Sequence, residues 1–196
     1  MTKAKEGARP RLSKADRRAQ LLGVAREMIR AEGADALTLS ALADRAGITK
    51  PVVYEHFGDR SGLFAALYRQ FDERQDASLE TALANAGPDA DGVVDVVAAS
   101  YIACARAEGI EMAGVVAALQ GTPVLARMRQ ESVVAYVERC RAALARVVGA
   151  ENIDPIALEA AFASADVLAG AVLASRIDER DAHETLVRIL HAAIGK

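Results

Sequence analysis

The sequence has 196 residues, of which 52% are hydrophobic and 26% are charged. A chain of this length and composition can bury a core, which argues against general disorder. The net charge of −3 conceals an asymmetry, because residues 1–60 hold 12 lysines and arginines against 8 acidic residues, whereas residues 61–196 hold 12 against 19. Such a basic segment is typical of phosphate-contacting proteins, although a basic surface that only aids solubility has the same composition.

Targeting and membrane segments are not expected. Residues 1–14 are polar and lack the apolar core of a signal peptide. The most apolar runs are broken by Asp95, Glu108, Glu111 or Asp166, so we expect no run of membrane-spanning length. A soluble, cytoplasmic protein is therefore predicted.

Catalytic and metal-binding patterns are also missing from the sequence. The glycines form no phosphate-binding loop pattern, and His183 and His191 lie eight residues apart with no ligand set around them. Cys104 and Cys140 lie far apart within helical patterns, which favours reduced thiols over a disulfide or a zinc site. We predict no enzyme activity, no cofactor and no metal.

The chain begins with a basic arm over residues 1–12, which we expect to be flexible. Such an arm can become ordered in a DNA minor groove, and simple attraction to phosphates is the alternative. Ser13 to Asp16 has the spacing of a capping box, which predicts a first helix over about 14–31 that ends at Gly33.

Two short helices joined by a tight turn are predicted between Thr38 and Phe57. Thr38 or Ser40 can cap the first, and Gly47 ends it, because glycine readily adopts the left-handed conformation that the turn requires. Thr49 can cap the second helix, with Pro51 in its first turn. This pattern predicts a helix-turn-helix domain over residues 13–60, with the polar side of the second helix free to enter a major groove.

The segment 17–71 is similar to the DNA-binding domain of the TetR family of transcriptional regulators. The similarity rests on residues that occur in the family's order: Ala25, Gly33, Thr38, Ala43, Ala46, Gly47, Ile48, Tyr54, His56, Phe57, Arg60 and Leu63.

The resemblance implies a set of DNA contacts on and around the second short helix. Lys50 would reach guanine or phosphate, and Pro51 and Val52 would pack against thymine methyls. Further contacts, chiefly with the DNA backbone, are expected from Thr38, Thr49, Tyr54, His56 and Arg60, the last of which lies at the start of the next helix. Glu55 can accept a hydrogen bond from cytosine, but a solvated carboxylate is the alternative.

The remaining segments read as helices over about 61–84, 92–107, 111–120, 123–148, 155–176 and 179–194. The fold class is therefore all-α, with about nine helices. Residues 85–92 form the clearest loop, and Gly109 is taken as a further break. We expect residues 61–196 to form an effector-binding and dimerisation domain, as in the TetR family.

The segment 157–175 is apolar on nearly all sides, so one neighbouring helix cannot cover it. The family resemblance likewise implies a homodimer through the last two helices, which would place two reading helices on a near-palindromic operator.

The family also implies a small-molecule effector that changes the spacing of the two DNA-binding domains. Polar or soft side chains on apolar helices are candidates for its site, with ordinary core placement as the alternative for each: Tyr101, Cys104, Met112, Gln120, Met128, Tyr136, Phe162 and Asp166. Asp166 and the scarcity of cations favour an apolar, weakly basic effector. The predicted function is a ligand-released repressor, and a helical ligand-binding or architectural protein without a specific operator is the alternative.

Overall fold

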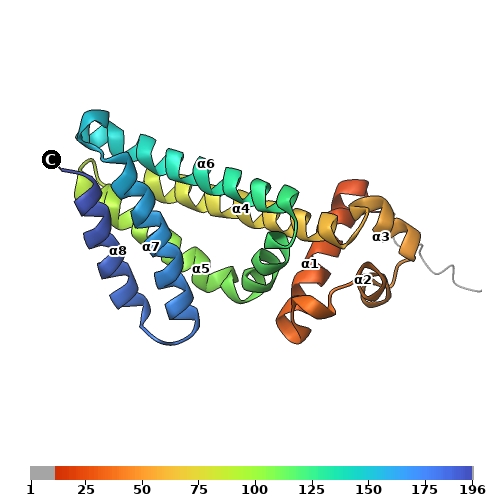
Figure 1. Cartoon of the computed structure of the whole chain (residues 1–196). Coiled ribbons are helices and arrows are strands. Elements are labelled where there is room, and N and C mark those ends of the chain that lie inside the picture. The colour runs from red at the N-terminus through yellow and green to blue at the C-terminus, as the bar shows by residue number, and fades with distance from the viewer. Residues whose placement is uncertain (1–11, 196) are drawn as a thin grey trace, which may run out of the picture. The chain divides into compact units, whose positions relative to one another are not determined.

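The computed structural model describes residues 12–195, apart from the side chains of Glu108, Ile110 and Gln120. Its regular elements are α-helices and two short 3-10 helices, and within this range the extended pairing is limited to an isolated antiparallel bridge between Ile153 and Ile194 (Figure 1). The predicted all-α class is confirmed. The predicted basic arm, apart from Leu12, lies outside the described residues.

The chain divides into two compact units, Met1–Leu63 and Phe64–Lys196, called here the N-terminal and C-terminal units. The N-terminal unit contains α1 (Lys14–Glu32), the 3-10 helix η1 (Ala34–Ala36), α2 (Leu39–Ala46) and α3 (Lys50–Phe57). It also holds the first turn of α4 (Arg60–Ala84), whose remaining turns belong to the C-terminal unit.

Local capping explains where the first helices begin. The Ser13 hydroxyl accepts a hydrogen bond from the Asp16 N–H at 3.0 Å, and the Thr38 hydroxyl accepts one from the Ala41 N–H at 3.1 Å. Both bonds satisfy amides that have no partner within the first turn of a helix.

The N-terminal unit has its own small core, formed where α1, α2 and α3 meet the start of α4. Its fully or nearly fully buried side chains are Leu21, Leu22, Ala25, Met28, Ile29, Leu37, Leu39, Leu42, Ala43, Val53, Phe57 and Leu63. Because α2 and α3 have only eight residues each, this shared core and not intrinsic helix propensity keeps them folded.

The C-terminal unit contains the rest of α4 together with α5 (Ala90–Gln120), α6 (Pro123–Val148), η2 (Ala150–Asn152), α7 (Pro155–Leu173) and α8 (Glu179–Ala193). Helix α5 packs against α6, α7 and α8, and α7 pairs most extensively with α8 (Figure 1). An ion pair between Asp76 and Arg139 joins α4 to α6.

The break expected at Gly109 is wrong, because α5 continues through it as one helix. A Cβ atom placed on Gly109 would lie 2.3 Å from the Leu173 Cδ1 atom at the end of α7. The glycine therefore makes room for a neighbouring side chain within a helix. Helix-breaking and close-approach glycines look alike in a single sequence.

Helix α7 corrects a second expectation, that no run approaches membrane-spanning length. By length and composition alone, Pro155–Leu173 is long and apolar enough to span a membrane. The expectation failed because Asp166 interrupts the apolar run without lowering its mean hydropathy enough. Core helices of soluble proteins pass the same test, and Leu158, Ala161 and Phe162 are buried within the C-terminal unit.

The opposite side of α7 is exposed and carries small or apolar residues at helical spacing, bordered by the exposed Glu159 and Asp166. This stripe, called here the α7 stripe, comprises Ile156, Ala160, Ala163, Val167, Gly170 and Ala174. Ile156 and Val167 are 78% and 67% exposed, which is unusual for side chains of this type.

Candidate nucleic-acid interface

The turn between α2 and α3 has the geometry that its glycine predicts. Gly47 adopts a left-handed conformation with φ of 65°, and the Ile48 N–H donates to the Ala43 carbonyl at 3.1 Å. These features end α2 within one residue and start α3 after only Ile48 and Thr49. The two short helices therefore have a fixed connection.

Helix α3 presents one exposed side and one buried side. Val53 and Phe57 are buried in the core, whereas Thr49, Lys50, Pro51 and Tyr54 are exposed. Tyr54 is 52% exposed, which is high for an aromatic side chain. The helix thus holds its apolar side in the core and leaves a cation, a proline and a phenol available to a partner.

Two predicted contact residues, Val52 and His56, are only half-exposed. Burial lowers the pKa of His56 below its ordinary value, so its imidazole is neutral at pH 7. A neutral ring still has one N–H that can donate to a phosphate.

The two threonines at the helix starts differ in how they are used. The Thr38 hydroxyl caps α2, and the side chain remains exposed. Thr49 precedes α3 without a hydrogen bond from its side chain to that helix, so the predicted cap is not made. The Thr49 hydroxyl is therefore not committed to capping.

Helix α1 supports α3 through two basic side chains that sequence reasoning did not identify. Lys14 Nζ lies 2.9 Å from Glu55 Oε1, and this hydrogen bond and ion pair hold the pKa of the Glu55 carboxyl below its ordinary value. The Arg18 guanidinium donates to the His56 carbonyl and lies over the Phe57 ring, 4.8 Å from its centroid. No local sequence pattern predicts these contacts, because the partners are separated by about 40 residues.

Most cations of residues 12–63 are occupied within the protein. Lys14 and Arg18 hold α3, and Arg45 pairs with Glu32. The Arg60 Nε donates to the Leu37 carbonyl at 2.9 Å, and a terminal nitrogen donates to the Ala34 carbonyl at 2.9 Å. The remaining arginines of this range, Arg17, Arg26 and Arg30, also have partners, so Lys50 is the cation of the described N-terminal unit without one.

The predicted effector residues are partly brought together in the C-terminal unit. The rings of Tyr101, Tyr136 and Phe162 contact one another, with centroids 5.7 to 6.0 Å apart. The Tyr101 hydroxyl donates to Asp166, whose other carboxylate oxygen lies 3.4 Å from Arg129. Arg129 was not singled out from the sequence, and its proximity removes the argument for a basic effector, because a cation already faces this carboxylate.

Burial dominates the chemistry of this cluster. It raises the pKa of Tyr101 and Tyr136, and it raises the pKa of the nearby Cys140 thiol to about 12. The Tyr136 hydroxyl is buried and makes no well-formed hydrogen bond within the described residues, with only the weakly hydrogen-bonding Cys140 sulfur beside it. An unsatisfied buried phenol is costly, so a partner from outside the chain would be favourable here.

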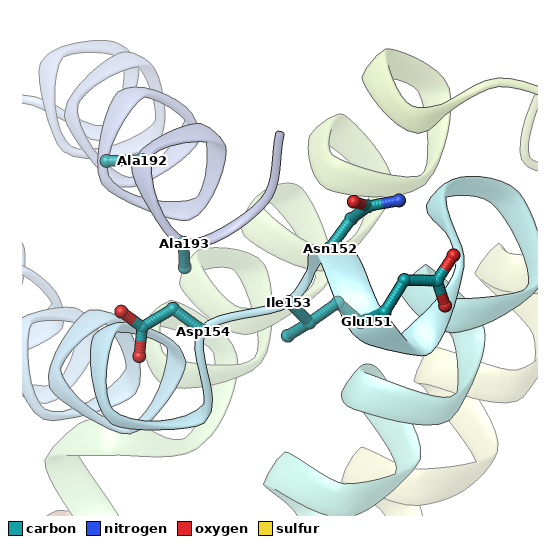
Figure 2. A pocket seen from close by; sticks show the side chains of 6 residues that line it. All are labelled: Glu151, Asn152, Ile153, Asp154, Ala192 and Ala193. Carbon is teal, nitrogen blue, oxygen red and sulfur yellow. The ribbon is translucent and has the colours of Figure 1, made fainter. Parts of the chain in front are cut away.

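The other predicted effector residues are distributed over α5 and α6. Cys104 and Met128 are half-buried, Met112 is buried, and the Gln120 side chain lies outside the described set. A pocket of about 240 Å³ lies elsewhere, where the segment before α7 meets the end of α8 (Figure 2). Its lining residues include none of the predicted effector residues: Glu151, Asn152, Ile153, Asp154, Ala192 and Ala193.

Comparison with known proteins agrees with this geometry. Residues 21–67 match the family of bacterial regulatory proteins called the tetR family. A stretch of 60 residues is 40% identical to the HTH-type transcriptional activator FasR of Mycolicibacterium smegmatis, and it covers 31% of this chain and 27% of FasR. Residues 21–67 form a DNA-binding domain of the TetR family.

Solved structures extend the TetR-family likeness beyond the N-terminal unit. A TetR-like transcriptional regulator from Rhodococcus sp. RHA1 has a TM-score of 0.72 at 19% identity, covering 92% of this chain and 97% of that one. The SmeT–triclosan complex has a TM-score of 0.69 at 21% identity, with 91% of each chain covered. At these identities the likeness shows that the fold is shared.

Proposed function

We propose that this TetR-family transcriptional regulator binds duplex DNA sequence-specifically through α3. The exposed side of α3 carries the proposal, because Lys50, Pro51 and Tyr54 project from a helix whose opposite side is fixed in the core. In a major groove, Lys50 would reach guanine acceptors or phosphate, and Pro51 and Val52 would pack against thymine methyls. Thr38, Thr49, Tyr54 and His56 would hydrogen-bond the DNA backbone.

A homodimer through α7 and α8 is the second part of the proposal. The α7 stripe offers small side chains that permit two helices to approach closely, and its exposed Ile156 and Val167 would gain from burial. A dimer would place two copies of α3 about one helical turn of DNA apart, roughly 34 Å, on a near-palindromic operator.

Regulation by a small molecule is the third part. The solved structure of SmeT is a complex with triclosan, and the cluster of Tyr101, Tyr136 and Phe162 suggests a comparable aromatic or apolar effector. The buried Tyr136 hydroxyl would donate one hydrogen bond to it. Such a ligand can release the protein from DNA only if it binds one spacing of the DNA-binding units better than another.

Repression of a promoter in the cytoplasm is the mode of action that we propose. FasR is named an activator, so a reporter gene placed downstream of the selected operator is needed to distinguish repression from activation. Reporter output that falls on expression of the protein supports repression, and output that rises shows activation.

The DNA-binding proposal is tested by selecting duplexes from a random library with the full-length chain. We expect enrichment of a near-palindrome, and we expect Tyr54→Ala to abolish its retention in a mobility-shift assay. Val134→Ala is the matched control, since it truncates a 57% exposed apolar side chain on α6. Failure to enrich any duplex would favour the alternative of a helical ligand-binding or architectural protein.

The effector proposal is tested by native mass spectrometry of the protein as purified and by thermal shift with triclosan as the probe. Binding should raise the melting temperature of the wild type more than that of Tyr136→Phe, which lacks the donor. Equal shifts in both proteins would place the probe elsewhere.

A further inference from the structure

The first turn of α4 contacts both ends of the helix-turn-helix segment. On one side, the Arg60 guanidinium bonds the carbonyls of Ala34 and Leu37, each at 2.9 Å. These carbonyls lie in the short connection between α1 and α2. The planar guanidinium has donors arranged in a fork, which lets one side chain bond two carbonyls three residues apart.

On the other side, the same turn is packed against the end of α3. A Cβ atom on Gly62 would lie 2.0 Å from the Phe57 carbonyl oxygen, so the backbone approaches as closely as a glycine allows. Asp59 begins the turn by accepting a hydrogen bond from the Gly62 N–H at 2.7 Å, and its own N–H donates to the Phe57 carbonyl at 2.9 Å. Residues 59–62 therefore contact both the segment that leads into α2 and the end of α3.

We infer that Arg60 is a positioning residue for the DNA-reading helix and not a phosphate contact. The inference rests on the proposed DNA binding, and it departs from the contact that the family resemblance suggests for this position. The two carbonyl bonds fix the start of α2 relative to α4, and Gly62 fixes the end of α3 relative to the same turn. A phosphate could recruit this guanidinium only in competition with those carbonyls.

The substitution R60K distinguishes a positioning role of Arg60 from a phosphate contact. An ammonium keeps the positive charge that a phosphate needs, but it lacks the fork that spans both carbonyls. If Arg60 positions α2 and α3, R60K lowers affinity for the selected duplex at least tenfold. If Arg60 contacts a phosphate as a point charge, R60K retains affinity within about twofold, which would overturn the inference.

The salt dependence of binding gives an independent criterion. Loss of one phosphate contact reduces the slope of log affinity against log salt by about 0.9. We expect this reduction in K50A, where the changed cation has no partner within the described unit. R60A should lose affinity with an unchanged slope, and a slope reduced as in K50A would contradict a positioning role.

Two further measurements test the positioning role even if R60K or R60A folds poorly or no duplex is found. In the wild type, phenylglyoxal should modify Arg60 slowly and equally with and without the duplex, as mapped by peptide mass spectrometry; protection that appears only with DNA overturns the inference. Amide exchange over residues 37–42 should be faster in R60K than in the wild type. This second measurement needs no DNA, so equal exchange refutes the positioning role even if no duplex is ever enriched and the proposed function fails.

Discussion

Tyr101 on α5 donates a hydrogen bond to Asp166 on α7, across 65 residues of sequence. The acceptor is a carboxylate, which strengthens the bond, and Arg129 on α6 lies beside the same group. Three helices of the C-terminal unit are thus joined through one aspartate. This arrangement supplies polar contacts next to a cluster of packed aromatic rings.

The Tyr101–Asp166 bond should appear as a coupling energy in a double-mutant cycle. Asp166→Ala leaves the Tyr101 hydroxyl without its acceptor, so we expect this change to cost more in the wild type than in Tyr101→Phe, by about 1 kcal/mol. Urea unfolding of the four proteins measures the difference. In a Tyr136→Phe background the cost of Asp166→Ala should be unchanged, because Tyr136 has no bond to Asp166. A coupling of zero would show that the bond is not made in solution.

Buried tyrosines should make the C-terminal unit sensitive to alkali. Burial raises the pKa of Tyr68 to about 12, whereas an unfolded tyrosine titrates near 10. A raised folded pKa contributes stability below the unfolded value, and this contribution is lost as pH rises from about 10 towards 12. Stability measured by urea should therefore fall over this window, and less steeply in Tyr68→Phe. A rise in tyrosinate absorbance at 295 nm near pH 10 that is present in the wild type but lost in Tyr68→Phe, with helical circular dichroism fully retained, would contradict this account.

Three glycines offer a graded test of close approach. Gly62→Ala should destabilise the protein by about 2 kcal/mol or more, because the new methyl group meets a backbone carbonyl that cannot move freely. Gly109→Ala should be near neutral, since the Leu173 side chain can rotate away and alanine favours the helix by about 1 kcal/mol. Gly23→Ala on the exposed side of α1 is the control and should stabilise. Thermal melting gives the order, and a Gly62→Ala variant as stable as the wild type would refute the predicted clash.

The α7 stripe should behave as a subunit interface. Val167→Glu places a charge where a partner helix would pack, so we expect the dimer to dissociate at micromolar concentration in sedimentation velocity. Val134→Glu, at a similarly exposed position on α6, should leave the dimer intact. A wild-type protein that sediments as a monomer would contradict the proposed homodimer.

Features of the N-terminal unit that depend on local chemistry could be predicted from the sequence. Ser13 and Thr38 cap their helices as expected, and Gly47 adopts the left-handed conformation that ends α2. Capping and turn formation involve residues within about four positions of each other, so a single sequence contains the necessary information. The buried sides of α1, α2 and α3 follow from the same helical spacing.

Features that depend on distant partners could not be predicted in this way. Nothing in the sequence around Gly109 distinguishes a glycine that makes room for Leu173 from one that ends a helix. Arg129 lies 37 residues from Asp166, and Arg60 lies 23 residues from Leu37, so their partners are set by the packing of helices. The sequence identified a cationic segment, but the division of its cations between internal bonds and a free surface required the fold.

The contact of Gly109 with Leu173 has a mechanical consequence for the C-terminal unit. A leucine side chain that occupies the space left by a missing Cβ opposes sliding of α5 along α7, because Leu173 would first have to change its rotamer. Rotation of α5 against α7 about this point of contact needs no such change, so we expect it to be the relative motion that this packing opposes least.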